Sequence, residues 1–408
     1  MAVNLKKPKN EDLHTISGIH LGTAIAEIKN KGQRDLLIIS LPEGSVVAGV
    51  FTKNQFCAAP VIVAQENIKQ TNKTRALIVN TGSANAGTGE IGIKDARDIC
   101  KSLAFKLKIK PHEVLPFSTG VIMEPLPVKK IQKKISEAIE DLNESNWQLA
   151  AEAIMTTDTI PKAISRQVTI QGQIINITGI SKGSGMIHPN MATMLAFIGM
   201  NANISSKMLN QLIQEVTKES FNCISVDGDT STNDSFIMMS TNQADHSQIN
   251  LDNKDYYILK SVMLDVAINL AQAIVRDGEG ATKFITIKIC EALNYTEAKK
   301  IAMTIACSLL VKTAFFASDA NLGRILSAIG NGEVEGLDIK KVDIYLNDLL
   351  FAEAGALAAS YNADSAQLEM KKSEIELRVM FGRGDGSVTI WTSDLSYDYV
   401  KINAEYRT

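Results

Sequence analysis

Residues 182–198 read KGSGMIHPNMATMLAFI, and this stretch decides the fold that the sequence predicts. Glycines stand at positions 183 and 185, and from Met194 onward the stretch is apolar. Glycine-rich segments form turns, whereas a short apolar run bounded by a turn predicts a buried strand. We therefore expect a loop that ends at Thr193, where a strand enters the core of a sheet.

Thr193 and the residue before it, Ala192, suggest a specific chemistry. The small Ala192 leaves its carbonyl accessible, and the strand holds the threonine hydroxyl rigidly beside that carbonyl. An N-terminal nucleophile needs this arrangement for self-cleavage. Spacing alone nevertheless favours an ordinary strand residue, because Ala-Thr pairs are common in strands. His188 is a candidate base in the same segment, but Pro189 beside it is equally typical of a turn.

The rest of the chain mixes strand and helix patterns, without a repeat or a low-complexity linker. β-branched residues on both sides of Gln171-Gly172 predict a hairpin over 166–179. Apolar residues at helical spacing predict an amphipathic helix over 128–142, and a second helix is expected with Ser145 as its N-cap. Further helices are expected near 205–220, 254–275, 295–310 and 319–330, and strands near 36–40, 45–51, 76–80, 282–290, 341–347, 374–381 and 387–392. Because these elements come in groups and not in strict strand–helix alternation, the pattern predicts an α+β fold with layered sheets.

The composition is that of an ordinary globular protein. Of 408 residues, 45% are hydrophobic and 21% are charged, and the formal net charge is −3, which gives no basic surface for nucleic acid. The N-terminal residues lack the apolar stretch of a secretory signal, and no run approaches the roughly 20 apolar residues of a membrane-spanning helix. The five cysteines are scattered without a Cys-x-x-Cys pair, which argues for a reducing compartment. We expect a cytoplasmic protein that binds neither nucleic acid nor a membrane.

Two other loops have the composition of ligand sites. Residues 87–92, GTGEIG, fit the G-x-G-x-x-G pattern, but several loop residues separate them from the preceding strand, so a tight structural loop is favoured over a dinucleotide site. Residues 227–234, DGDTSTND, are rich in oxygen atoms, but the glycine in second place does not fit a calcium loop, and Asx turns explain such segments without metal. We expect neither a metal nor a resident cofactor.

Several long motifs occur in an order that resembles one enzyme family. Besides 182–198, the matching pieces are VNTGSANAGTGE (79–90), PFSTGVIME (116–124), MTTDTIPK (155–162), SVDGDTSTND (225–234), RDGEGATKF (276–284), LVKTAFFASDANLGRILSAIG (310–330) and YDYVKINAEYRT (397–408). The chain is similar over most of its length to the ornithine acetyltransferases (glutamate N-acetyltransferases) of arginine biosynthesis. It departs from their pattern at Ala320 and Leu322, where a proline and a tryptophan are usual.

The resemblance implies a precursor that cleaves itself between Ala192 and Thr193. The products would be an α chain, residues 1–192, and a β chain, residues 193–408, which together form one intertwined catalytic unit. The implied architecture is a layered αββα sandwich with a smaller α/β region towards the C-terminus. The implied assembly is α2β2 or larger.

The resemblance also implies a reaction and its residues. Thr193 would take the acetyl group from N2-acetyl-L-ornithine and pass it to L-glutamate, with Thr119 and Gly120 forming the oxyanion hole; spacing alone reads Ser118-Thr-Gly as a turn. The implied substrate contacts are Thr156, Lys182, Thr193, Glu279, Asn403 and Thr408. The sequence does not separate Thr156 from its neighbour Thr157.

Three alternatives remain open at the level of sequence. The enzyme could also accept acetyl-CoA as a co-substrate and so be bifunctional. It could be an aminopeptidase of the N-terminal-nucleophile type, which transfers to water. A non-catalytic binding protein would show neither self-cleavage nor acetyl transfer.

Overall fold

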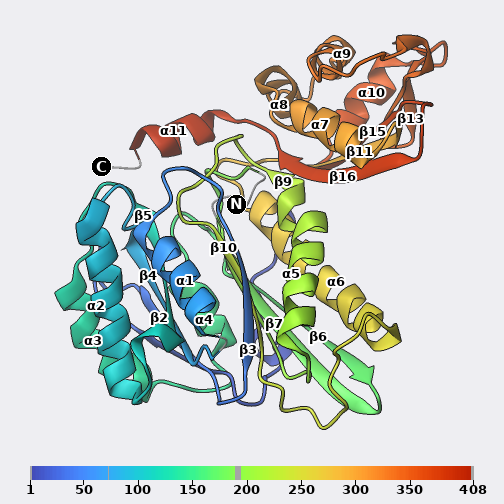
Figure 1. Cartoon of the computed structure of the whole chain (residues 1–408). Coiled ribbons are helices and arrows are strands. Elements are labelled where there is room, and N and C mark those ends of the chain that lie inside the picture. Colours follow the sequence, from blue (N-terminus) through green and yellow to red (C-terminus); the bar gives the residue numbers. More distant parts are fainter. Residues whose placement is uncertain (1, 72, 189–193, 406–408) are drawn as a thin grey trace. The chain divides into compact units, whose positions relative to one another are not determined.

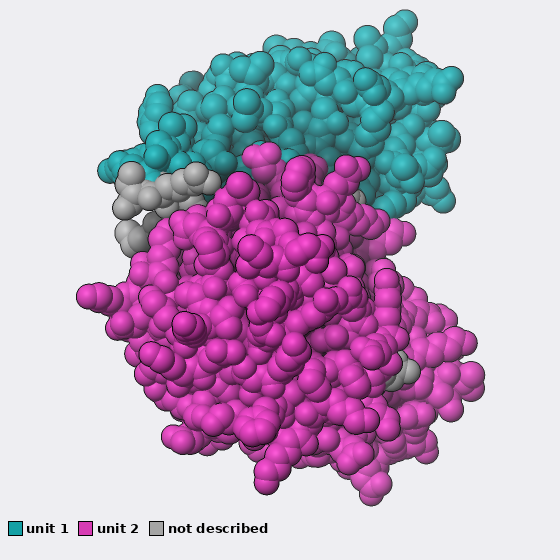
Figure 2. Space-filling view, turned by 60° about the vertical axis from the view of Figure 1, so that its left-hand side comes forward, with its two compact units in different colours: residues 1–5, 223–228, 275–408 teal, residues 6–222, 229–274 magenta. Residues whose placement is uncertain are grey.

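The computed structural model describes residues 2–71, 73–188 and 194–405 and divides into two compact units (Figures 1 and 2). The larger unit comprises residues 6–222 and 229–274, and the smaller unit comprises residues 1–5, 223–228 and 275–408. The predicted boundary after residue 192 lies within the sequence range of the larger unit, so it does not coincide with a boundary between the units.

The larger unit contains two sheets. The four-stranded sheet runs in the order β1 (His20–Ala24), β2 (Leu36–Ser40), β4 (Ala76–Ser83) and β5 (Val114–Val121). The five-stranded sheet runs in the order β3 (Val46–Phe51), β10 (Ser235–Ser240), β8 (Leu195–Met200), β7 (Gln173–Lys182) and β6 (Lys162–Ile170). The predicted loop-to-strand transition is therefore correct, because β8 begins two residues after Thr193 and is buried along its whole length.

Successive side chains of β2 point to opposite faces of the sheet, and this alternation explains how the layers form. Leu37 and Ile39 belong to a core cluster that includes Phe197 of β8, whereas Leu36 and Ile38 belong to a second cluster with residues of two helices. These helices are α2 (Gly89–Leu107) and α3 (Val128–Glu140). One face of the sheet thus packs on the other sheet, and its opposite face packs on helices.

Helices α5 (Ser206–Glu219) and α6 (Lys254–Arg276) cover the outer face of the five-stranded sheet, opposite α2 and α3 (Figure 1). A Cβ atom built on Gly179 of β7 would lie 2.9 Å from Leu270 of α6, which places this helix directly on the sheet. Two shorter helices, α1 (Ala59–Gln70) and α4 (Trp147–Ala153), complete the list of α-helices described for the unit. The expected αββα sandwich is confirmed.

The smaller unit is built on one sheet. Its seven strands run in the order β14 (Ala356–Leu357), β13 (Leu349–Glu353), β12 (Asp343–Leu346), β15 (Glu374–Met380), β11 (Phe284–Ala292), β16 (Gly386–Ser393) and β9 (Ile224–Ser225). Its helices are α7 (Tyr295–Ala306), α8 (Leu309–Phe316), α9 (Leu322–Gly330), α10 (Ala363–Met370) and α11 (Tyr397–Glu405). This unit matches the smaller α/β region that was expected towards the C-terminus.

Three local expectations were wrong. The helix predicted near 295–310 is two helices, because the Ser308 side chain accepts a hydrogen bond from the Val311 N–H and starts α8. Ser145 does not cap α4; its hydroxyl binds Asn143 instead. The strand predicted over 76–80 continues to Ser83, since its last residues pair with β5. Helix α6 is long and apolar enough to span a membrane, but half of its apolar window is buried, as in a core helix.

Candidate active site

The end of β7 and the start of β8 lie side by side at one end of these two inner strands of the five-stranded sheet. The two strands are antiparallel, and Lys182, the last residue of β7, pairs with Leu195, the first residue of β8. Thr193, the predicted nucleophile, and Ala192 lie outside the described residues, as does Thr408. Met194 is the first described residue after Thr193, and it directly precedes Leu195. Lys182 therefore pairs with a residue that lies two positions after Thr193.

Met194 is held by the neighbouring strand β10. Its N–H donates a hydrogen bond to Oδ1 of Asp234 over 3.0 Å, and its carbonyl accepts one from the Ser235 N–H over 3.1 Å. Asp234 is fully buried, and this burial raises its pKa well above the usual carboxyl range, even though the Met194 N–H and the charge of Lys182 act in the opposite direction. The Asp234 carboxyl is therefore protonated more readily than an ordinary one.

Thr119 and Gly120, the predicted oxyanion-hole residues, lie near the end of β5 and not in a turn. Gly120 has a φ of +133°, and a Cβ atom added there would lie 2.4 Å from the Gly82 carbonyl carbon on β4. Only glycine fits this position, because an L-residue would be strained and would also collide with the neighbouring backbone. The strand pair thus brings two backbones together just after Thr119.

Lys182 and Thr119 connect the two sheets. The Lys182 ammonium donates a hydrogen bond to Oγ1 of Thr119 over 3.2 Å, although 63 residues separate them in sequence. Both residues are buried. A hydroxyl that accepts from an ammonium keeps its own proton available for a second partner. Thr119 can therefore donate to a bound oxyanion while Lys182 supplies positive charge beside it.

Thr156 and Thr157 differ in what their hydroxyl groups contact. The Thr157 Oγ1 lies 2.6 Å from the Oγ of Ser184 and shares a hydrogen bond with it. Thr156 is half-buried, and its N–H donates to Asp158, but its hydroxyl makes no hydrogen bond to another residue that the structure describes. Of the two, Thr156 is the one whose hydroxyl is available to a ligand.

Glu279 and Asn403 lie together in the smaller unit. The Asn403 side-chain amide donates to Oε2 of Glu279 over 2.8 Å, across 124 residues of sequence. Helix α11, which carries Asn403, is attached at Tyr399, whose hydroxyl donates to Oδ2 of Asp227 over 3.2 Å, and through Ser396, which donates to the Gly280 carbonyl over 2.6 Å. Two predicted substrate contacts from distant motifs therefore adjoin each other.

Sequence reasoning missed two buried carboxyl groups, Asp158 and Asp234. Each lies inside a motif that the resemblance singled out, and each immediately follows polar residues at the edge of a buried segment. The presence of each aspartate within a matching motif could have indicated a role. The spacing of its neighbours, however, does not distinguish a buried carboxyl from one in a surface turn.

The two ligand-like loops serve structural roles in the described chain. Gly87 and Gly89 have positive φ angles of 68° and 57°, and α2 begins at Gly89, so this segment forms a tight loop at the start of that helix. Asp227 receives the Tyr399 hydroxyl, and Asp234 receives the Met194 N–H. Among the described residues, no three His, Cys, Asp or Glu side chains gather as a metal site would require.

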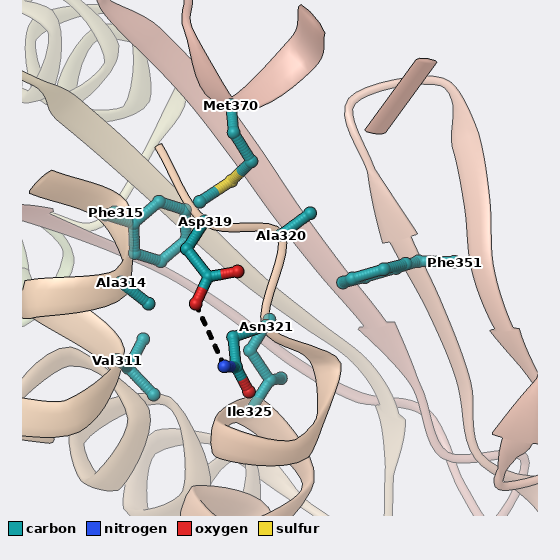
Figure 3. A pocket seen from close by; sticks show the side chains of 9 residues that line it. All are labelled: Val311, Ala314, Phe315, Asp319, Ala320, Asn321, Ile325, Phe351 and Met370. Atoms are coloured by element: carbon teal, nitrogen blue, oxygen red, sulfur yellow. Dashed lines mark hydrogen bonds between the residues drawn. The ribbon is translucent and has the colours of Figure 1, made fainter. Parts of the chain in front are cut away.

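A small pocket lies in the smaller unit beside α8 and α9 (Figure 3). Its lining residues are Val311, Ala314, Phe315, Asp319, Ala320, Asn321, Ile325, Phe351 and Met370. The two polar groups that face it bind each other, since the Asn321 amide donates to Oδ2 of Asp319 over 3.0 Å. Its lining includes Ala320, where the family has a proline, and none of the predicted site residues. We interpret it as a packing gap.

Comparison with known proteins identifies related chains. Residues 20–408 match the family model described as "ArgJ family". The chain is 50% identical over 424 aligned positions, covering 100% of both chains, to the arginine biosynthesis bifunctional protein ArgJ of Colwellia psychrerythraea. Among solved structures, ArgJ from Bacillus halodurans is 34% identical over 51% of this chain and 97% of its own, with a TM-score of 0.49. An ornithine acetyltransferase from Mycobacterium tuberculosis, solved with ornithine, is 30% identical over 45% of this chain and 97% of its own, with a TM-score of 0.40.

Proposed function

This chain belongs to the ArgJ family, and we propose on that basis that it transfers the acetyl group of N2-acetyl-L-ornithine to L-glutamate. The products are L-ornithine and N-acetyl-L-glutamate, as in the cyclic route of arginine biosynthesis, and the acetyl group is carried as an ester on Thr193. The observation that carries the proposal is the position of Lys182. It pairs with the first residue of β8, two residues after Thr193, and binds Thr119.

In the first step, the chain cleaves itself. The Thr193 hydroxyl attacks the Ala192 carbonyl, the acyl group shifts from nitrogen to oxygen, and water hydrolyses the resulting ester. This yields the α chain, residues 1–192, and the β chain, residues 193–408. An unperturbed α-amine has a pKa of about 7.7–8.0, so a useful neutral fraction of such a group exists near neutral pH and can accept the proton of the Thr193 hydroxyl. No histidine is needed as a base.

Acetyl transfer then follows by double displacement. The α-amine takes the proton of the Thr193 hydroxyl as the oxygen attacks the acetyl carbonyl of acetylornithine, and it returns that proton to the ornithine nitrogen as the C–N bond breaks. The neutral amine of glutamate then attacks the acetyl ester, and its proton passes through the α-amine to the departing Thr193 oxygen. The Thr119 hydroxyl and the Gly120 N–H stabilise the oxyanion in both steps. The close approach of the β4 and β5 backbones at Gly120 supports this role, because a rigid donor costs no reorganisation when charge develops.

Both substrates carry an ammonium or amine and a carboxylate, and the proposed contacts offer both charges. Lys182 meets a carboxylate and Glu279 meets an ammonium, each through a charge-assisted hydrogen bond. Asn403, which already binds Glu279, orients that carboxylate. Thr156 adds a hydroxyl, and Thr193 and Thr408 complete the proposed set.

A second activity is the synthesis of N-acetylglutamate from acetyl-CoA and glutamate. The observation that favours it is the relative from Colwellia psychrerythraea, which covers the whole chain and is named as a bifunctional protein. Acetyl-CoA would then be a co-substrate, and no metal or resident cofactor takes part. We also propose an α2β2 or larger assembly in the cytoplasm, with no nucleic-acid partner.

The decisive experiment is an intact-mass measurement of the wild type beside Thr193→Ala. The wild type should yield two species that match 1–192 and 193–408, and the variant should stay at 44.3 kDa. The processed enzyme should then transfer acetyl from acetylornithine to glutamate, and incubation with acetyl-CoA and glutamate alone tests the second activity. A wild type that stays whole contradicts the mechanism, whereas processing followed by hydrolysis of aminoacyl amides without an amine acceptor indicates the aminopeptidase.

A further inference from the structure

Asn233 lies in the loop before β10, next to Asp234, and is buried. Its side-chain nitrogen donates two hydrogen bonds to backbone carbonyls, one to Ser118 over 2.9 Å and one to Ala84 over 2.6 Å. Ser118 belongs to β5, whereas Ala84 directly follows β4. One side chain from the segment before β10 thus binds the ends of two strands of the four-stranded sheet.

Neighbouring side chains fix the orientation of the Asn233 amide. The Thr232 hydroxyl donates to its Oδ1 over 2.6 Å, and the Oγ of Ser231 accepts a hydrogen bond from the Asn233 N–H over 3.0 Å. A hydroxyl can donate to the amide oxygen, whereas a backbone carbonyl can only accept a hydrogen bond. The amide nitrogen must therefore face the two carbonyls, and it has one hydrogen for each of them.

Asp234, the next residue, binds the chain just after the proposed nucleophile. Its Oδ1 accepts the Met194 N–H, while Asn233 binds Ser118, which directly precedes Thr119. Consecutive Cα atoms lie about 3.8 Å apart across a trans peptide, so this connection is short. Two consecutive residues thereby join the start of the nucleophile strand to the strand that carries the proposed oxyanion donor.

We propose that Asn233 is a positioning residue for the oxyanion hole. By holding the Ser118 carbonyl, it fixes the peptide between Ser118 and Thr119, and so sets where the Thr119 hydroxyl lies relative to the nucleophile strand. A catalytic group misplaced by about 1 Å can cost about a hundredfold in rate. The inference rests on the proposed function and adds to it the contact that holds the oxyanion donor in place.

The main test is Asn233→Ala in the full chain. The Ser118 carbonyl then loses this donor, and Thr119 shifts. We expect the kcat of acetyl transfer at saturating glutamate to fall about tenfold or more, because only transition-state stabilisation is lost. The KM for N2-acetylornithine should change less than about threefold, because the proposed substrate contacts lie on other segments. A smaller fall in kcat, or a KM that rises as much as kcat falls, would overturn the proposal.

Intact mass gives the cleaved fraction of each variant, so that kcat is expressed per molecule of cleaved enzyme. Asn146→Ala is the matched control, because the Asn146 amide also donates to two backbone carbonyls in the same unit, those of Leu21 over 3.0 Å and Asp141 over 2.8 Å. Both variants should lower the free energy of unfolding, since each leaves two carbonyls without a donor. Asn146→Ala should keep the wild-type kcat. Equal losses of kcat in the two variants would overturn the proposal.

A double variant tests whether Asn233 acts through Thr119. Substitutions of residues that act as a unit are not additive in their effects on rate. Added to Thr119→Ala, the Asn233→Ala change should therefore lower kcat by less than about threefold. A larger further loss would show that Asn233 acts on another part of the enzyme, and would overturn the proposal.

Asn233→Ser keeps the test decisive if the alanine variant does not fold. The shorter serine side chain has one hydroxyl and can donate to at most one of the two carbonyls, so kcat should fall at least about threefold. A wild-type kcat in Asn233→Ser would overturn the proposal.

The wild type and Thr119→Ala separate this inference from the proposed function. A wild type that neither cleaves nor transfers acetyl contradicts the proposed function, as does a wild-type kcat in Thr119→Ala alone. A wild type that does both, together with Asn233 variants that cleave and keep the wild-type kcat, contradicts only the positioning role.

Discussion

The Met194 N–H donates a hydrogen bond to a carboxyl oxygen of Asp234, which is fully buried and immediately precedes β10. Strands β8 and β10 run parallel and in register from Leu195 and Ser235 onward, so this bond extends the pairing by one residue. The chain is therefore fixed immediately after the proposed nucleophile. The second carboxyl oxygen of Asp234 has no hydrogen-bond partner among residues 2–71, 73–188 and 194–405.

The first prediction concerns the pH dependence of stability at Asp234. Burial raises the pKa of this carboxyl in the folded state, so its stabilising effect is complete below the ordinary carboxyl pKa of 3.8 and is lost as pH rises towards the folded value. Asp234→Asn keeps an acceptor for Met194 and does not ionise. The free energy of unfolding of the variant relative to the wild type should therefore increase as the pH rises from 5 to 8. Denaturant unfolding measures this difference, with both proteins also carrying Thr193→Ala so that both chains stay whole.

Asp234→Ala provides the contrast for this prediction. It leaves the Met194 N–H without its acceptor inside the protein, which typically costs about 1–3 kcal/mol. Self-cleavage should slow in the alanine variant and stay close to wild type in the asparagine variant. A stability difference between Asp234→Asn and wild type that is the same at both pH values would show that Asp234 ionises normally in the folded protein.

The second prediction is that Gly120→Ala abolishes most acetyl transfer. The added Cβ would meet the Gly82 backbone at 2.4 Å and so displace the proposed oxyanion donor. Loss of one such donor typically lowers kcat by about 10²–10³. Gly172→Ala is the matched control, since Gly172 also has a positive φ, of 80°, but no atom lies within 4 Å of its added Cβ. Equal kcat values in the two variants would remove Gly120 from the oxyanion hole.

The third prediction separates the two adjacent threonines. Thr156→Val should raise the KM for acetylornithine and leave stability nearly unchanged, because the Thr156 hydroxyl binds no described residue. Thr157→Val removes the hydrogen bond to Ser184 and should lower the free energy of unfolding by about 0.5–1.5 kcal/mol. Steady-state kinetics and denaturant unfolding of both variants provide the comparison. The reverse assignment would follow if only Thr157→Val raised KM without a loss of stability.

The fourth prediction concerns the C-terminal residues. Deletion of 403–408 removes the partner of Glu279 but leaves the Tyr399–Asp227 contact that attaches α11. The truncated chain should still cleave itself, while its KM for both amino-acid substrates rises. Chain termini are usually dispensable, so an effect on KM alone would be informative. Unchanged kinetics would exclude Asn403 and Thr408 from the substrate site.

Local sequence patterns predicted most of the elements around the site. The hairpin at Gln171-Gly172, the amphipathic helix α3 and the strand after Thr193 follow from turn residues and from periods of two or 3.6, and all are observed. The errors arose where a side chain can form a hydrogen bond with one of several nearby groups. Ser308, for example, caps α8 and so divides one predicted helix into two. Such choices depend on distances of a few ångströms that a periodic pattern does not encode.

By itself, the sequence determined the strands, the layered fold and the family, because periodicity, turn residues and long motifs are properties of neighbouring positions. Tertiary structure alone decided that Lys182 binds Thr119, that Asn403 binds Glu279, and that Asp158 and Asp234 are buried with opposite pKa shifts. The physical reason is that the ionisation of a carboxyl depends on desolvation and on nearby charges. Desolvation comes from the packing around each carboxyl, and part of the charge comes from a residue distant in sequence, because Lys182 acts on both carboxyls although it lies 24 residues from Asp158 and 52 from Asp234.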